Sequence, residues 1–245
     1  MSRPLKDLLR TSDLSKADIE LLLDTASKFA KKPLRAKKCL SKKTVAIYMT
    51  KSSTRTRLAS ETAVAHLGGS PIFLRADDLQ IGRGETISDT AKIISGFCSA
   101  LIVRTFAQSD VDELGKHASI PVINALTDDD HPTQLLADWL TIHERFGKDL
   151  KGRKFSYIGD GNNVCNSFLN FAAVVPYHFV LAAPEGYDPD PETLARAKAA
   201  GISTVEVIRD PVEAAKNADV LYTDVWTSMG QEDERRKRLN DFKGF

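Results

Sequence analysis

The stretch TVAIYMTKSSTRTR, residues 44–57, decides the fold of the N-terminal half of the chain. Its first part, Thr44–Met49, is a short continuous apolar run, which predicts a strand that is buried on both faces. A helical pattern follows directly, over residues 58–67. A buried strand that leads straight into a helix is the repeating unit of a parallel sheet, so the stretch predicts an α/β fold.

The turn between this strand and this helix, Lys51–Arg57, combines hydroxyl side chains with cations. The first N–H groups of a helix have no partner within the helix, and the helix dipole adds partial positive charge at the same end. Hydroxyls and guanidinium groups supply further donors, so the turn predicts a site for a phosphate or a similar anion. The alternative is that Ser53 or Thr54 merely caps the helix while the cations lie in water.

The rest of the chain continues the pattern, because short apolar runs alternate with longer helical patterns. We therefore predict an α/β protein of two domains, each a mainly parallel sheet flanked by helices on both faces. Eight runs are expected to form the strands, four in each half: Thr44–Met49, Pro71–Leu74, Ala100–Arg104 and Pro121–Asn124, then Lys154–Gly159, His178–Ala182, Thr204–Val207 and Val220–Thr223.

A domain boundary is expected where the long helical pattern that begins at His131 ends. Residues 146–153 read FGKDLKGR, in which two glycines and a cluster of charges interrupt the pattern. The predicted domains are therefore residues 1–147 and residues 148–245.

Composition and charge favour small ligands over nucleic acid or membrane surfaces. The 34 Lys and Arg nearly balance the 33 Asp and Glu, so any anion site must be local. Cys39, Cys98 and Cys165 lack metal-ligand spacing, which favours free thiols in a reducing compartment and neither a disulfide nor zinc. The first residues lack the apolar core of a signal peptide, and no run approaches transmembrane length. These features predict a cytoplasmic protein.

A second candidate site lies at the start of the long helix, where residues 131–134 read HPTQ. Pro132 suits the first helical turn, because its missing N–H is not needed there. His131 and Gln134 are three residues apart and are expected to point the same way. Donors of this kind can stabilise an oxyanion that develops at a carbonyl group. The alternative for His131 is a helix cap or a buried structural group.

Two further segments follow predicted strands of the C-terminal half. Residues 159–164 read GDGNNV, which half resembles a dinucleotide-binding turn. Val164 takes the place of the third glycine of that turn, which argues against a nicotinamide cofactor. Residues 223–230 read TDVWTSMG, and a carboxylate such as Asp224 beyond the carboxyl end of a strand suits an ammonium group. Alternatively, Asp224 and Ser228 organise a loop or a helix start.

Together, these four segments resemble the aspartate/ornithine carbamoyltransferase family, and the resemblance covers residues 5–245. STRTR at residues 53–57 and HPTQ at residues 131–134 are similar to the family's two carbamoyl phosphate signatures, in the same order. The family resemblance implies one domain for carbamoyl phosphate, residues 1–147, and one for the amino acid, residues 148–245.

The C-terminal half looks like the ornithine branch of the family. GDGNN at residues 159–163, Asp224 and SMG at residues 228–230 carry this resemblance. The loop LQIGRGE at residues 79–85 agrees, because the aspartate branch characteristically has a lysine there.

The resemblance implies a role for each matching residue. The phosphate of carbamoyl phosphate is implied to be held by Ser53, Thr54, Arg55, Thr56 and Arg104. The carbamoyl group is implied to be polarised by His131 and Gln134, joined by Arg55 and Thr56. Gln80 is implied to reach the carbamoyl phosphate site from a neighbouring subunit. Ornithine is implied to be held by Asn163, Asp224, Ser228 and Met229. The residues implied to act in catalysis are Arg55, Arg104, His131, Gln134 and Asp224.

The implied reaction is attack of the uncharged δ-amine of L-ornithine on the carbamoyl carbon, which expels phosphate and gives L-citrulline. The resemblance implies no metal and no organic cofactor, and it implies a homotrimer or a multiple of trimers. Several alternatives remain open: a carbamoyltransferase for putrescine, acetylornithine or aspartate, or a non-catalytic relative. The residues do not decide between citrulline synthesis for arginine biosynthesis and citrulline breakdown.

One departure from the family concerns the end of the sequence. The family normally continues with a His-Cys-Leu-Pro segment, an arginine and a final helix, whereas this sequence ends at Phe245. The cysteine and leucine of that segment help to hold ornithine and the carbamoyl group. Cys165 is no substitute, because it is expected within the helix that follows the GDG turn. We therefore expect a truncated sequence, the alternative being a protein that has lost part of its site.

Overall fold

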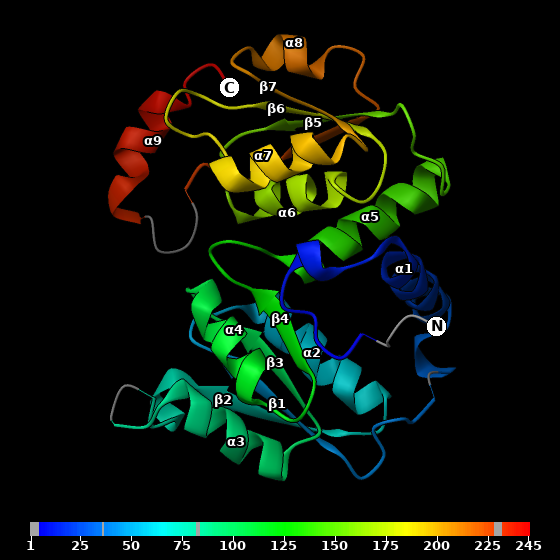
Figure 1. Cartoon of the computed structure of the whole chain (residues 1–245), viewed down its shortest axis with the longest axis vertical. Helices are drawn as coiled ribbons and strands as arrows, with labels where there is room; N and C mark the ends of the chain where they lie inside the picture. Colours follow the sequence, from blue (N-terminus) through cyan, green and yellow to red (C-terminus); the bar gives the residue numbers. More distant parts are fainter. Residues whose placement is uncertain (1–4, 36, 82–83, 228–231) are drawn as a thin grey trace. The chain divides into compact units, whose positions relative to one another are not determined.

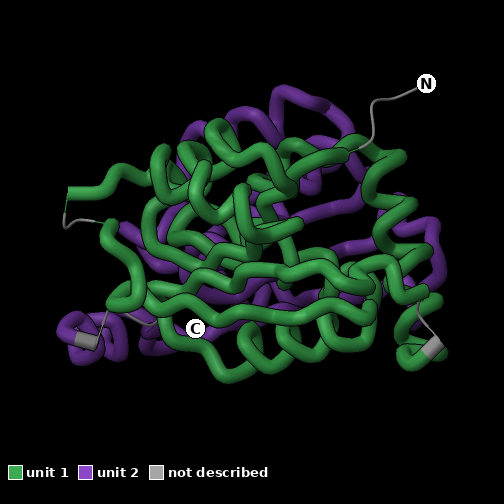
Figure 2. The backbone as a smooth tube through the Cα atoms, turned by 90° about the horizontal axis from the view of Figure 1, so that it is seen from below, with its two compact units in different colours: residues 1–140 green, residues 141–245 purple. Residues whose placement is uncertain are grey.

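A computed structural model describes residues 5–35, 37–81, 84–227 and 232–245 of the chain. The chain forms two compact units, Met1–Leu140 and Thr141–Phe245, which are coloured separately in Figure 2. Each unit contains one four-stranded sheet whose neighbouring strands are all parallel. This confirms the predicted fold class. The division between the units falls within helix α5 (Pro132–Phe146), and the domain boundary after Gly147 stays a prediction.

The N-terminal unit has the strand order β2-β1-β3-β4. The strands are β1 (Thr44–Met49), β2 (Ser70–Arg75), β3 (Ala100–Arg104) and β4 (Val122–Leu126). The helices are α1 (Lys16–Lys31), α2 (Thr54–His66), α3 (Ile87–Phe97), α4 (Gln108–His117) and the first part of α5. Short 3-10 helices lie at Thr11–Asp13, Pro33–Arg35 and Ala76–Asp78. The predicted strands of this half are therefore all present, with two of them at their predicted bounds.

The connections in this unit leave the sheet towards opposite faces. Helix α2 leads from β1 to β2, whereas α3 and α4 lead in the other direction across the sheet. Because parallel crossovers are right-handed, α2 must cover one face and α3 with α4 the other, as Figure 1 shows. The core between the sheet and the α3/α4 pair includes Ala46, Leu101 and Val111. Strands β1 and β3 are thus neighbours whose following segments diverge, which is the position where open α/β sheets bind ligands.

The C-terminal unit has the strand order β7-β6-β5-β8. Its strands are β5 (Lys154–Ile158), β6 (His178–Ala182), β7 (Thr204–Ile208) and β8 (Val220–Thr223). Its helices are α6 (Asn163–Ala172), α7 (Pro191–Ala200), α8 (Pro211–Ala215) and α9 (Arg235–Asp241), with a 3-10 helix at Glu232–Glu234. Helices α6 and α7 cover one face of the sheet and α8 covers the other (Figure 1). In this unit, β5 and β8 are the neighbouring strands whose following segments leave in opposite directions.

Aromatic packing fixes helix α6 on the C-terminal sheet. The ring of Phe168 stacks on Phe179 of β6 at 6.0 Å and meets Tyr222 of β8 edge-on at 5.1 Å between centroids. Tyr157 of β5 stacks on Tyr222 at 5.3 Å. Aromatic pairs at such distances add to the energy of burial alone. The contacts hold the N-terminus of α6 beside the ends of β5 and β8.

Candidate active site

The predicted anion turn lies at the carboxyl end of β1, next to β3. Ser53 is the N-cap of α2, and its Oγ accepts a hydrogen bond from the N–H of Thr56 at 3.2 Å. The capping alternative is therefore what the structure shows for Ser53 in this state. Thr54 and Arg55 lie in the first turn with exposed side chains, where the helix supplies no acceptor for their amides. The turn accordingly combines a cap with a first helical turn whose amides need acceptors from outside the helix.

Arg104 brings a guanidinium to the same place from the end of β3. It lies opposite Met49 in the ladder, and its Nη1 donates to Thr56 Oγ1 at 3.3 Å. Burial lowers the pKa of Arg104, although a guanidinium keeps its proton at any physiological pH. Its Nε is buried and has no hydrogen-bond partner among the described residues. A buried donor without an acceptor is costly, and a bound oxyanion would supply the missing acceptor.

His131 directly precedes α5, at the end of the loop that follows β4. Burial and, secondarily, the nearby charge of Arg104 lower the pKa of His131 to about 3. The imidazole is therefore neutral near pH 7, where it can donate one hydrogen bond and accept another. Thr133 Oγ1 lies 3.4 Å from His131 Nδ1, and Gln134 Nε2 donates to Asp138 Oδ1 at 2.9 Å. Asp138 thereby orients the amide of Gln134.

Gln80 is exposed and follows the short 3-10 helix Ala76–Asp78. Its carbonyl oxygen accepts a hydrogen bond from the N–H of Glu85 at 3.4 Å. Within the described part of this single chain, no contact links the side chain of Gln80 to Ser53 or Arg104. The expectation that Gln80 acts on a neighbouring subunit stays a prediction.

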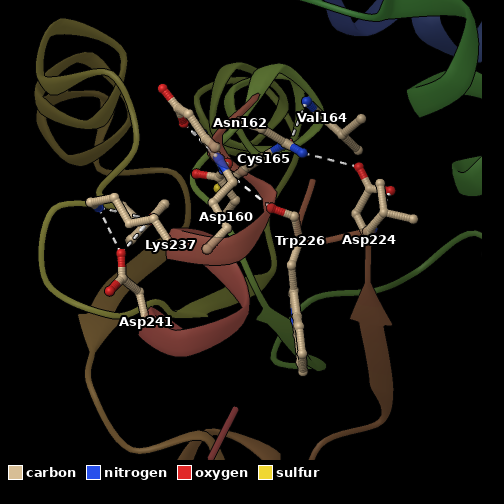
Figure 3. A network of polar contacts seen from close by, with 12 residues as sticks. Asp160, Asn162, Val164, Cys165, Asp224, Trp226, Lys237 and Asp241 are labelled. Carbon is tan, nitrogen blue, oxygen red and sulfur yellow. Dashed lines mark hydrogen bonds and ion pairs between the residues drawn. The ribbon is translucent and has the colours of Figure 1, made fainter. Parts of the chain in front are cut away.

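The second candidate site lies between the ends of β5 and β8 in the C-terminal unit. Asn162 caps α6, since its Oδ1 accepts from the N–H groups of Val164 at 3.0 Å and Cys165 at 3.2 Å. Its Nδ2 donates to Asp224 Oδ2 at 3.0 Å, which joins the two strand ends (Figure 3). Asp224 Oδ1 accepts from the N–H of Val225 at 2.7 Å. The carboxylate is thus fixed in direction.

The asparagine that contacts Asp224 is Asn162, which the sequence analysis did not single out. Asn163, which it did, is the first residue of α6, and its carbonyl accepts from Ser167 Oγ at 2.8 Å. The ornithine-binding role of Asn163 stays a prediction. A signal for Asn162 existed in the sequence, because asparagine is favoured at the cap of a helix and the turn offers a cap at this position.

The glycines of this turn serve the packing of the chain itself. A Cβ on Gly161 would lie 2.3 Å from the backbone nitrogen of Pro189. The N–H of Gly161 also donates to the carbonyl of Tyr187 at 2.9 Å. Glycine is therefore required at position 161 because the chain approaches its own backbone there.

Ser228 and Met229 lie outside the described residues, as does the rest of residues 228–231. The segment before them is held by Arg238 of α9. Its Nη1 donates to Asp160 Oδ2 at 2.6 Å and to the carbonyl of Trp226 at 3.3 Å, and its Nε donates to Glu234 at 2.9 Å. The side chains of Arg238 and Asp160 are only 9% and 13% exposed.

Aromatic contacts support the same attachment of α9. Phe242 stacks on Trp226 at 5.7 Å and meets Tyr187 edge-on at 4.7 Å. Lys237 and Asp241 form an ion pair beside it, at 2.6 Å (Figure 3). Neither Asp160 nor Arg238 was predicted as a site residue. Arg238 stands in the charged run RRKR, a pattern typical of a solvated helix face.

No three His, Cys, Asp or Glu side chains in the described part of the chain gather closely enough to hold a metal ion. No helix in that part of the chain has the length and apolar character needed to cross a bilayer.

Comparison with protein families matches both halves of the chain. Residues 6–144 match the profile described as aspartate/ornithine carbamoyltransferase, carbamoyl-P binding domain. Residues 151–245 match the profile of the Asp/Orn binding domain of the same family.

Individual relatives agree over nearly the whole chain. An ornithine carbamoyltransferase of Methanosarcina acetivorans is 45% identical over 98% of this chain and 80% of the relative. One of Bacillus subtilis is 49% identical over 97% of this chain and 74% of the relative. Among solved structures, ornithine carbamoyltransferase from Pyrococcus furiosus has a TM-score of 0.90 at 44% identity and covers 98% of this chain and 78% of its own. The anabolic enzyme of Campylobacter jejuni has a TM-score of 0.91 at 38% identity, with 98% and 80% covered.

Proposed function

Because the chain belongs to the aspartate/ornithine carbamoyltransferase family, we propose that its two pairs of diverging strands hold the two substrates of one carbamoyl transfer. The enzyme transfers the carbamoyl group of carbamoyl phosphate to the δ-amine of L-ornithine and releases L-citrulline and phosphate. The relatives that support ornithine as the acceptor are 45% to 49% identical over at least 97% of the chain.

The observation that carries the proposal is the buried Arg104 Nε, which has no partner among the described residues and lies beside the Ser53 turn. In this proposal the phosphate of carbamoyl phosphate accepts from Arg104, Arg55, and the hydroxyls and amides of Ser53, Thr54 and Thr56. Their combined positive charge stabilises the phosphate as it leaves. Catalysis of this kind rests on position and electrostatics rather than on a covalent intermediate.

We assign the carbamoyl oxygen to the neutral imidazole of His131 and the amide of Gln134. With a pKa of about 3, His131 acts as a hydrogen-bond donor to the developing oxyanion rather than as a general acid. The new C–N bond forms as the C–O bond to phosphate breaks. The proton released by the attacking nitrogen is taken up by phosphate or by solvent.

The ornithine half of the proposal rests on Asp224. Asn162 and the N–H of Val225 orient its carboxylate, which keeps lone pairs for the α-ammonium group of the amino acid. Asn163, Ser228 and Met229 complete this proposed site.

The finer biological setting is also proposed. The reaction serves arginine biosynthesis. This direction is supported by the related enzyme of Campylobacter jejuni, which is described as anabolic. The chain works in the cytoplasm as a homotrimer, in which Gln80 of one subunit completes the carbamoyl phosphate site of the next. The exposure of Gln80 is consistent with that role.

Product formation tests the choice of acceptor. The purified chain is supplied with carbamoyl phosphate and equal concentrations of ornithine, aspartate and putrescine, and the carbamoylated products are separated and quantified. Citrulline is the expected product. Preferential formation of carbamoyl aspartate or carbamoyl putrescine would overturn the assignment of ornithine.

A further inference from the structure

Three chain segments carry the residues proposed to hold carbamoyl phosphate. They are the turn after β1, the end of β3 and the loop between β4 and α5, which ends at His131. The backbone ladder joins these strands only as far as their ends, with Thr50 N–H donating to the Arg104 carbonyl at 3.0 Å and Thr105 N–H to the Leu126 carbonyl at 3.0 Å. Beyond these bonds, side-chain contacts contribute to the spacing of the segments.

Lys51 contacts all three segments. It belongs to the turn after β1, yet its side chain is only 6% exposed. Its ammonium forms an ion pair with Asp128 of the loop before α5 and lies 4.4 Å from the ring centroid of Phe106, which follows β3. Asp128 N–H in turn donates to the carbonyl of Phe106 at 2.8 Å. One cation therefore ties together the three segments of the site.

The position of Asp128 explains why a cation is needed there. Asp128 lies three residues before His131, in a loop that also contains Asp129 and Asp130. An uncompensated carboxylate in this loop would oppose the entry of a dianionic phosphate. The ammonium of Lys51 compensates the negative charge of Asp128. The same ammonium already contacts the Asp128 carboxylate and the ring of Phe106.

We propose that Lys51 is a positioning residue for carbamoyl phosphate, which neutralises Asp128 and ties the His131 loop to the Ser53 turn without contacting the phosphate. This inference rests on the proposed function of the N-terminal unit. It differs from the reading suggested by the cationic sequence of the turn, in which Lys51 would be one more phosphate ligand.

A double-mutant cycle separates the two roles. Carbamoyl phosphate is titrated calorimetrically into the full chain and into the variants Lys51→Met, Asp128→Asn and Lys51→Met/Asp128→Asn. Lys51→Met alone should weaken binding by about tenfold, the scale of one uncompensated charge near an ionic ligand. In the Asp128→Asn background, where the ion pair between the loop and the turn is already broken, the same substitution should cost less than about threefold. An equal loss in both backgrounds would show a direct phosphate contact and overturn the proposal.

Controls keep the outcome interpretable. Lys92→Met removes an exposed cation of the same unit from its pair with Asp89 and should leave binding unchanged. If Lys51→Met does not fold, the comparison of Asp128→Asn with the double variant still decides, because neither variant contains an unpaired Asp128 carboxylate. Unchanged affinity together with a lowered unfolding midpoint in Lys51→Met would show a purely structural role and also contradict the proposal. Failure of the unaltered chain to bind carbamoyl phosphate would instead refute the proposed function.

Discussion

At the scale of single residues, the protonation of His131 is a consequence of where the chain puts it. Its pKa in the folded chain is about 3, below the ordinary value of 6.5, so the unfolded chain binds the proton first as the pH falls. The imidazole contributes no acid sensitivity above pH 6.5, and stability is lost as the pH falls from 6.5 towards 3. If neutral His131 takes part in catalysis, the reaction rate should likewise not change near pH 7 through protonation of this group.

Replacing His131 should therefore make the chain less sensitive to acid. Between pH 6.5 and pH 5 the unaltered chain should lose up to about 2 kcal/mol through this one group. In His131→Gln that part of the loss should disappear, as measured by urea unfolding at both pH values. His66→Gln, at an exposed histidine of α2, is the control and should keep the full loss. An equal pH dependence of His131→Gln and the unaltered chain would contradict the buried neutral imidazole.

At this scale, the sequence predicts which residues lie in the candidate sites better than it predicts which side chains contact one another. An anion site was predicted for the Ser53 turn, with helix capping as the alternative. Ser53 does cap α2, and the anion site stays a prediction. Asn162 was missed because its contact with Asp224 spans 62 positions of the chain. A contact of that kind depends on β5 and β8 lying side by side, and the sequence alone does not reveal the strand order.

At the scale of elements, the buried cation Arg238 links helix α9 to two loops of the C-terminal unit, beside the aromatic contacts of Phe242. Arg238 joins Asp160 in the turn after β5 to the Trp226 carbonyl before the SMG segment. Removing one partner of a buried ion pair leaves the other charge uncompensated, which is commonly worse than losing both. The pair should therefore govern the stability of the C-terminal unit and, under the proposed function, its affinity for ornithine.

Arg238→Met should lower the free energy of unfolding by about 2–4 kcal/mol, because it leaves the Asp160 carboxylate buried without its cation. It should also weaken ornithine binding while sparing carbamoyl phosphate binding. Urea unfolding and calorimetry with each substrate measure these effects. Lys216→Met, which breaks a pair with Glu213 whose side chains are 65% and 64% exposed, is the control and should change stability by less than about 1 kcal/mol. Normal stability and ornithine affinity in Arg238→Met would refute the attachment.

At the scale of the whole molecule, the alternation of apolar runs and helices was sufficient to predict two parallel sheets. It was not sufficient to predict their topologies, since the two halves alternate alike but have different strand orders, β2-β1-β3-β4 and β7-β6-β5-β8. Alternation reports which segments are buried on both faces, whereas strand order depends on the direction of each crossover. In both units some candidate residues lie at the pair of neighbouring strands whose connections diverge, Ser53 and Arg104 in the first unit and Asp224 in the second, whereas His131 follows β4. The same topological rule therefore predicts both candidate sites.

The central claim is that carbamoyl phosphate binds at the ends of β1 and β3, where the buried Nε–H of Arg104 has no acceptor among the described residues. Calorimetric titration of carbamoyl phosphate into the unaltered chain, Arg104→Met and Asp224→Asn tests it most directly. We expect binding to the unaltered chain and to Asp224→Asn with similar affinity, and a loss of at least about tenfold in Arg104→Met, the scale of one charge-assisted hydrogen bond. Equal affinity of Arg104→Met and the unaltered chain would contradict the account.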